Sequence, residues 1–173
     1  MPYGMVLLPD RATHDLLVEL AGVIGGPDPI NKLGDHAPAH VSVIHFDGPP
    51  EEIEARAAAH PVRTLQVRPI GLLYTVVSPG DYYVPQGGVY HGIEIVRRPD
   101  LNALHAEALS WVRESGATPL GAVGADYRPH ITLGMTATPV LPDLRALLLG
   151  EIYVRPAFGK LGPYGTFPGL LCT

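Results

Sequence analysis

The chain has 173 residues, of which 46% are hydrophobic. This is enough for a buried core and short enough to favour a single domain. Its net charge of −5, with no block of like charge, excludes a basic coat for nucleic acid, so a phosphate-bearing partner would have to be bound by a local pocket. The apolar stretches are shorter than the roughly 20 residues that a membrane-spanning helix needs. A single cysteine and the lack of a signal-peptide pattern predict a cytoplasmic protein without disulfide or metal–thiolate chemistry.

The first half of the chain alternates predicted strands and helices, with the 20 glycines and 19 prolines scattered between apolar runs as turn residues. Apolar runs closed by Pro or Gly predict strands, and apolar residues at helical spacing predict helices. In chain order these are a strand at 3–8, a helix at 15–24, a strand at 40–46, a helix at 51–60, a strand pair or one interrupted strand at 64–77, and a turn at 81–88.

The second half repeats this order of elements. The pattern predicts a strand at 89–96, a helix at 101–114, a strand at 127–135, a short helix at 142–149 and a strand at 151–160.

Several short sequences recur at a nearly constant offset between the halves, which points to an internal repeat. The offset is 90 residues for the first three pairs and 87 for the last. They are Pro9-Asp10 and Pro99-Asp100, His40 and His130, Ser42 and Thr132, and Val67-Arg68-Pro69 and Val154-Arg155-Pro156. We therefore expect one domain spanning residues 1–173, built from two similar lobes of strand, helix, strand, helix and strand with a further strand in each, and with repeat halves at roughly 1–80 and 88–173.

Each half carries a histidine followed two residues later by a hydroxyl residue, in His40-Val41-Ser42-Val43 and His130-Ile131-Thr132-Leu133. Residues two apart share one face of a strand, so each histidine should point the same way as its hydroxyl. If a pseudo-twofold brought the strands together, two imidazoles and two hydroxyls would face one cleft. One neutral imidazole can deprotonate an attacking oxygen while a protonated one supplies the leaving oxygen, and the hydroxyls can hold phosphoryl oxygens.

With these two motifs, the chain resembles the two-histidine (2H) phosphoesterase superfamily, which includes RNA 2′,5′-ligase-like proteins and cyclic phosphodiesterases. Tyr127-Arg128-Pro129 before the second motif fits the family pattern, in which an aromatic residue and a proline commonly precede the histidine, whereas Ser42 stands where threonine is commoner. The resemblance implies a bilobal α+β fold, with antiparallel sheets around a central V-shaped cleft. It also implies metal-independent opening or formation of 2′-type phosphoester bonds.

Three further residues are candidates for substrate binding. Arg128 either reaches the cleft to neutralise phosphate or is a surface arginine, and Tyr164 either stacks on a base or is an exposed turn residue. Tyr127 is a candidate through its place in the motif. His45 has the opposite strand parity from His40 and is not expected in the cleft, and five other histidines have no catalytic pattern: His14, His36, His60, His91 and His105.

The function predicted is a hydrolase of a cyclic phosphodiester, such as a 2′,3′-cyclic nucleotide, an RNA terminal cyclic phosphate or ADP-ribose 1″,2″-cyclic phosphate. It needs no cofactor or metal, and the protein is expected to be a monomer whose partner is a small nucleotide or RNA terminus. His40 and His130 share the acid and base roles in an order that the sequence leaves open, while Ser42 and Thr132 bind phosphate. The alternatives are a 2′,5′-RNA ligase-type activity, a non-catalytic nucleotide- or RNA-end-binding module, and a metal-dependent enzyme using His36, His40 and His45.

Overall fold

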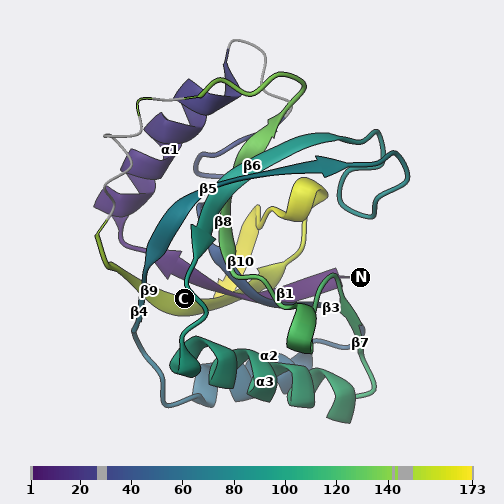
Figure 1. The fold of residues 1–173 in the computed structure, drawn as a ribbon. Coiled ribbons are helices and arrows are strands. Elements are labelled where there is room, and N and C mark those ends of the chain that lie inside the picture. The colour runs from purple at the N-terminus through teal and green to yellow at the C-terminus, as the bar shows by residue number, and fades with distance from the viewer. Residues whose placement is uncertain (1, 27–30, 142, 144–149, 173) are drawn as a thin grey trace.

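A computed structural model describes residues 2–26, 31–141, 143 and 150–172, which form an α+β fold with an antiparallel sheet (Figure 1). The α-helices of this described part are α1 (Arg11–Gly25), α2 (Glu51–Ala59) and α3 (Pro99–Glu114). The strands are β1 (Pro2–Pro9), β2 (Asn31–Lys32), β3 (Val41–Asp47), β4 (Leu65–Val67), β5 (Pro69–Val77), β6 (Gly88–Ile95), β7 (Thr118–Leu120), β8 (His130–Thr136), β9 (Ile152–Lys160) and β10 (Gly169–Cys172).

The strands form one connected sheet and not the separate sheets that were expected. Its main order is β10-β9-β1-β3-β8-β6-β5, with β2 beside β8, β4 beside β9 and β7 beside β3. Each half of the sequence contributes one strand to the strand group of the other half. Strand β5 of the first half pairs with β6 of the second, and β9 of the second half pairs with β1 of the first. The strand group β9-β1-β3 meets the group β8-β6-β5 at the pair of Val41 with Ile131. The register that this pair implies places His40 across from Thr132 and His130 across from Ser42.

Most predicted elements are confirmed, with shifted ends. Helix α1 begins at Arg11, earlier than predicted, because the Asp10 carboxylate accepts a hydrogen bond from the Thr13 amide at 2.7 Å and caps the helix. Of the two possibilities predicted for 64–77, the strand pair is the one found, as β4 and β5, which pair with different strands. Strand β8 begins at His130 and not at residue 127, and the helix predicted at 142–149 lies outside the described residues. Strands β2, β7 and β10 were not predicted because they span only two to four residues.

A β-bulge interrupts each of the two strands that carry a motif. In β3, Ser42 pairs with Val6 and Ile44 with Met5, so that Val43 is the extra residue. In β8 the corresponding register shift makes Leu133 the extra residue, 90 positions later. A bulge inverts the alternation of side chains beyond it. His45 therefore lies on the same face as Ser42, and the prediction that it stays out of the cleft is wrong.

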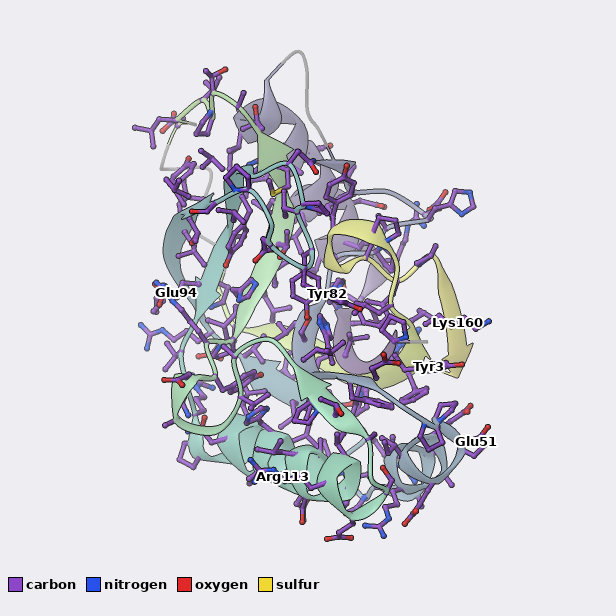
Figure 2. All side chains as sticks on the ribbon, turned by 90° about the vertical axis from the view of Figure 1, so that its right-hand side faces the viewer. Tyr3, Glu51, Tyr82, Glu94, Arg113 and Lys160 are labelled. Atoms are coloured by element: carbon purple, nitrogen blue, oxygen red, sulfur yellow. The ribbon has the colours of Figure 1, made fainter. Side chains whose placement is uncertain are left out.

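Two of these helices pack against the strands that carry the motifs. Helix α1 packs against β8 and β2, whereas α2 and α3 lie side by side and α3 packs against β3 (Figure 1). Their charged side chains, such as Glu51 and Arg113, lie on the outer surface (Figure 2). Strand β1 is buried on both faces: Met5 and Leu7 join the main core, while Val6 and Leu8 pack in a second cluster with Phe167. Within the described part of the chain, none of the helices combines the length and apolarity needed to span a membrane.

Candidate active site

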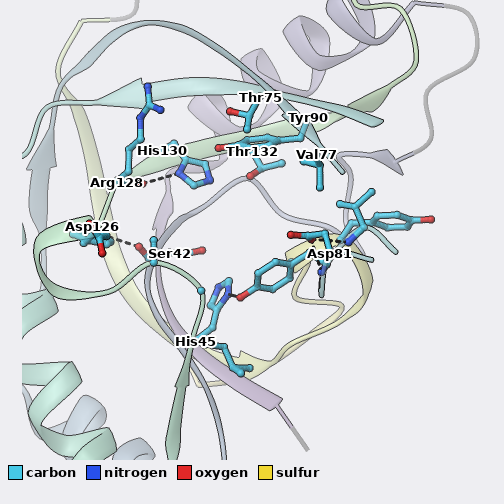
Figure 3. Close-up of a pocket in the computed structure, with 18 of the residues that line it drawn as sticks. Ser42, His45, Thr75, Val77, Asp81, Tyr90, Asp126, Arg128, His130 and Thr132 are labelled. Carbon is cyan, nitrogen blue, oxygen red and sulfur yellow. Dashed lines mark hydrogen bonds between the residues drawn. The ribbon is translucent and has the colours of Figure 1, made fainter. Parts of the chain in front are cut away.

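A pocket of about 540 Å³ lies where β3 and β8 meet, and both sequence motifs contribute to its lining (Figure 3). His40 and Ser42 reach it from the β3 side, and His130 and Thr132 reach it from β8. The single pairing of Val41 with Ile131 brings the four side chains together, while those two apolar residues are fully buried in the core.

Both motif histidines are oriented by the same kind of hydrogen bond. Nδ1 of His40 lies 2.8 Å from the carbonyl oxygen of Pro38, and Nδ1 of His130 lies 2.7 Å from that of Arg128. A carbonyl oxygen can only accept, so Nδ1 carries the proton in each ring. In the neutral imidazole the basic nitrogen is then Nε2, which is the tautomer that a general base at this position requires.

The two rings have lowered pKa values. Burial, with a smaller contribution from the nearby His130 ring, lowers the pKa of His40 to about 4, although the hydrogen bond to the Pro38 carbonyl opposes the shift. Burial also lowers the pKa of His130, against the hydrogen bond to Arg128. The unliganded site therefore favours neutral rings at pH 7.

Aromatic side chains position the two rings. Phe167 meets the ring of His40 edge-on, with 5.0 Å between centroids, and belongs to the second hydrophobic cluster behind β1. Tyr90 of β6 lies 5.4 Å from the ring of His130 and also lines the pocket. Neither contact was predicted, because both join segments that are far apart in the sequence.

His45 is a third histidine of the pocket lining. Its Nδ1 lies within hydrogen-bond distance of the Tyr83 hydroxyl oxygen, at 2.8 Å. Burial, and then the two motif histidines, lower the pKa of His45 to about 3, which keeps the ring neutral. The available sequence signal was the adjacent apolar pair Val43-Ile44, which breaks the alternation of the strand.

The three candidate substrate-binding residues also line this pocket, in different environments. Tyr127 is only 5% exposed, donates its hydroxyl proton to the Ser42 carbonyl oxygen at 2.9 Å and stacks on His105. This contact fits a residue that positions β3. Arg128 is exposed and donates from Nε to the Glu94 carboxylate at 3.1 Å. Tyr164 lies in a short 3₁₀ turn at a positive φ of 58°, within hydrogen-bond reach of Gln86.

The remaining histidines lie outside the pocket lining. His105 supports the site from behind, since its Nδ1 donates to the Val43 carbonyl oxygen and its Nε2 accepts from the Gly124 amide. His36 is exposed on a turn. Within the described ranges of the chain, no three His, Cys, Asp or Glu side chains are grouped so as to hold a metal ion, so the set of His36, His40 and His45 has no geometric support.

Comparisons with known proteins show that the fold of this chain is similar to that of a solved structure. The chain is similar to a solved structure described as "Crystal structure of phosphoesterase", with a TM-score of 0.50 and 15% sequence identity over 91% of this chain and 85% of that one. No family model and no curated protein matches the chain. At this level of identity the likeness shows that the chain shares the fold of that phosphoesterase.

Proposed function

We propose that this protein is a phosphoesterase that hydrolyses a cyclic phosphodiester by two-histidine acid–base catalysis. The observation that carries the proposal is the matched pair of rings, since His40 and His130 line one pocket. In each ring, Nδ1 donates a hydrogen bond to the carbonyl oxygen of the residue two positions earlier. The likeness to a phosphoesterase structure supports the same class of reaction.

The reaction follows from this pair of imidazoles. Nε2 of the neutral ring takes a proton from water as the water oxygen attacks phosphorus. The bond from phosphorus to one ribose oxygen breaks, and the protonated ring gives its proton to that oxygen. The hydroxyl of the water molecule therefore ends on phosphorus and a proton ends on the leaving ribose oxygen, so the product is a phosphomonoester. We assign to the hydroxyls of Ser42 and Thr132 the binding of the non-bridging oxygens, whose charge persists through the transition state.

We further propose that the two motifs descend from one duplicated unit, with the pocket as the cleft between its copies. The motifs, the two β-bulges and the two histidine–carbonyl bonds all recur at the same 90-residue offset, which supports this origin. The exchange of β5 and β9 between the strand groups fits two copies that assembled together.

The test is turnover of a panel of cyclic phosphates: nucleoside 2′,3′-cyclic phosphates, a short RNA with a terminal cyclic phosphate, and ADP-ribose 1″,2″-cyclic phosphate. We expect hydrolysis that persists in EDTA, and identifying the hydroxyl that keeps the phosphate defines which bond breaks. Binding without turnover would contradict the proposal and favour a recognition module. Joining of RNA ends without hydrolysis would favour a ligase-type activity.

A further inference from the structure

The charges around the pocket are unusual for a site that receives phosphate. Among the described residues that line it, the charged groups outside the histidines are the carboxylates of Asp81 and Asp126 and the guanidinium of Arg128. Figure 3 shows Asp126 and Arg128 on one side and Asp81 on the other. The lining therefore carries more negative than positive charge.

The single guanidinium is also partly neutralised. Arg128 pairs through Nε with the Glu94 carboxylate at 3.1 Å, and this contact raises the pKa of the arginine. The histidines add little positive charge at pH 7, because burial lowers the pKa values of His40, His45 and His130. Before substrate binds, the lining therefore offers one cationic side chain, and that side chain is shared with Glu94.

Both carboxylates belong to exposed residues of the pocket lining. Asp81 is fixed by its own turn, because one carboxylate oxygen accepts from the amides of Tyr83 at 2.8 Å and Val84 at 3.0 Å. Asp126 ends the short 3₁₀ turn that leads into the second motif, four residues before His130. Much of the remaining lining is apolar or aromatic and suits an uncharged group such as a nucleobase: Val76, Val77, Tyr83, Val84, Leu120 and Val123.

Substrates of the proposed reaction differ in charge. A cyclic phosphodiester carries one negative charge, whereas a phosphomonoester carries about −1.5 to −2 at pH 7. We infer that the pocket selects singly charged cyclic phosphodiesters, such as a nucleoside 2′,3′-cyclic phosphate with a free 5′-hydroxyl, over forms that bear a second phosphate. This inference rests on the proposed function and narrows its substrate class. The same carboxylates favour release of the product, which is more negative than the substrate.

The test compares cytidine 2′,3′-cyclic phosphate with its 5′-phosphorylated form. We expect kcat/KM to be about tenfold or more higher for the former, and the ratio to shrink as salt screens the carboxylates. Asp126→Asn should lower this ratio of kcat/KM values, because it should raise kcat/KM for the 5′-phosphorylated substrate. Asp126 is preferred to Asp81 because its replacement leaves the capped turn intact. Glu19→Gln on the exposed face of α1 removes the same charge away from the pocket and should leave the ratio unchanged.

A binding measurement separates this inference from the proposed function. Calorimetric affinities of both nucleotides for His40→Ala, in which cleavage should be too slow to interfere, are expected to show the same preference. Hydrolysis with equal kcat/KM for both substrates would overturn the charge selectivity and leave the proposed function standing. Absence of hydrolysis of either nucleotide, together with equal affinities, would overturn both.

Discussion

At the scale of single residues, the site is a set of neutral, oriented rings. The carbonyls of Pro38 and Arg128 fix the tautomers of His40 and His130, while burial keeps both rings neutral until an anion arrives. A bound phosphodiester places a negative charge beside the rings and should raise their pKa values. In the proposed reaction, substrate binding would therefore allow one ring to carry the proton that the leaving oxygen needs.

This electrostatic arrangement predicts an acidic optimum for kcat/KM. In the proposed mechanism, the active free enzyme has one protonated and one neutral ring, so its population should peak between the two apparent pKa values, both of which lie below 6.5. We expect kcat/KM to fall as the pH rises above 6.5, because the acid loses its proton, and to fall again below about pH 4. The optimum of kcat should lie at higher pH. A kcat/KM that rises from pH 6.5 to 8.5 would contradict this account.

At the scale of elements, the two bulged strands define the site. The contact of β3 with β8 brings the motifs together, and the bulges at Val43 and Leu133 decide which side chains beyond them turn toward the pocket. The main chain of β6 also approaches that of β8 closely at Gly92. A Cβ added at Gly92 would overlap the carbonyl oxygen of Ile131, directly between His130 and Thr132.

Gly92→Ala is therefore expected to destabilise the fold and disturb the site. The backbone of β8 would have to move, which should lower the free energy of unfolding by about 1–3 kcal/mol and reduce kcat. Gly71→Ala is the matched control, because a Cβ there meets nothing within 4 Å. Urea unfolding of both variants makes the comparison. Equal stability of the two would show that the close approach does not matter.

Sequence patterns predicted the four motif residues but not all that surrounds them. His40, Ser42, His130 and Thr132 were predicted because strand alternation and the repeat offset are local signals. The orientation of His45 was predicted wrongly, because the bulge in β3 inverts the alternation of side chains beyond it. This bulge depends on the pairing of β3 with β1, which the local sequence does not show. The exchange of β5 and β9 between strand groups was equally hidden, because strand pairing over long separations leaves no periodic signature.

At the scale of the whole molecule, folding buries histidines that acid must protonate. His91 is 1% exposed, its pKa is lowered to about 4 by burial, and neither ring nitrogen has a hydrogen-bond partner among the described residues. His40 has a similarly lowered pKa. The unfolded chain titrates near pH 6.5 and so binds more protons than the folded one below that pH. Stability is therefore lost as the pH falls from about 6.5 toward 4.

This linkage predicts that His91→Met stabilises the protein, and more at pH 5 than at pH 8. Methionine occupies the corresponding place in β1, where Met5 pairs with Ile44 beside the bulge as His91 pairs with Gly134. His36→Gln, on an exposed turn, is the control and should change little. The measurement is urea unfolding at both pH values. A stability gain that is the same at pH 5 and pH 8 would contradict the titration of His91.

Central to the proposed function is the joint action of His40 and His130 on a single phosphoester. The most direct test is kcat/KM on the best cyclic phosphate of the panel for His40→Ala, His130→Ala and the double variant, each checked for folding by circular dichroism. We expect each single variant to lose about 10²- to 10⁴-fold, with the double variant losing less than the product of the two losses. Wild-type kcat/KM in either folded single variant would contradict the claim.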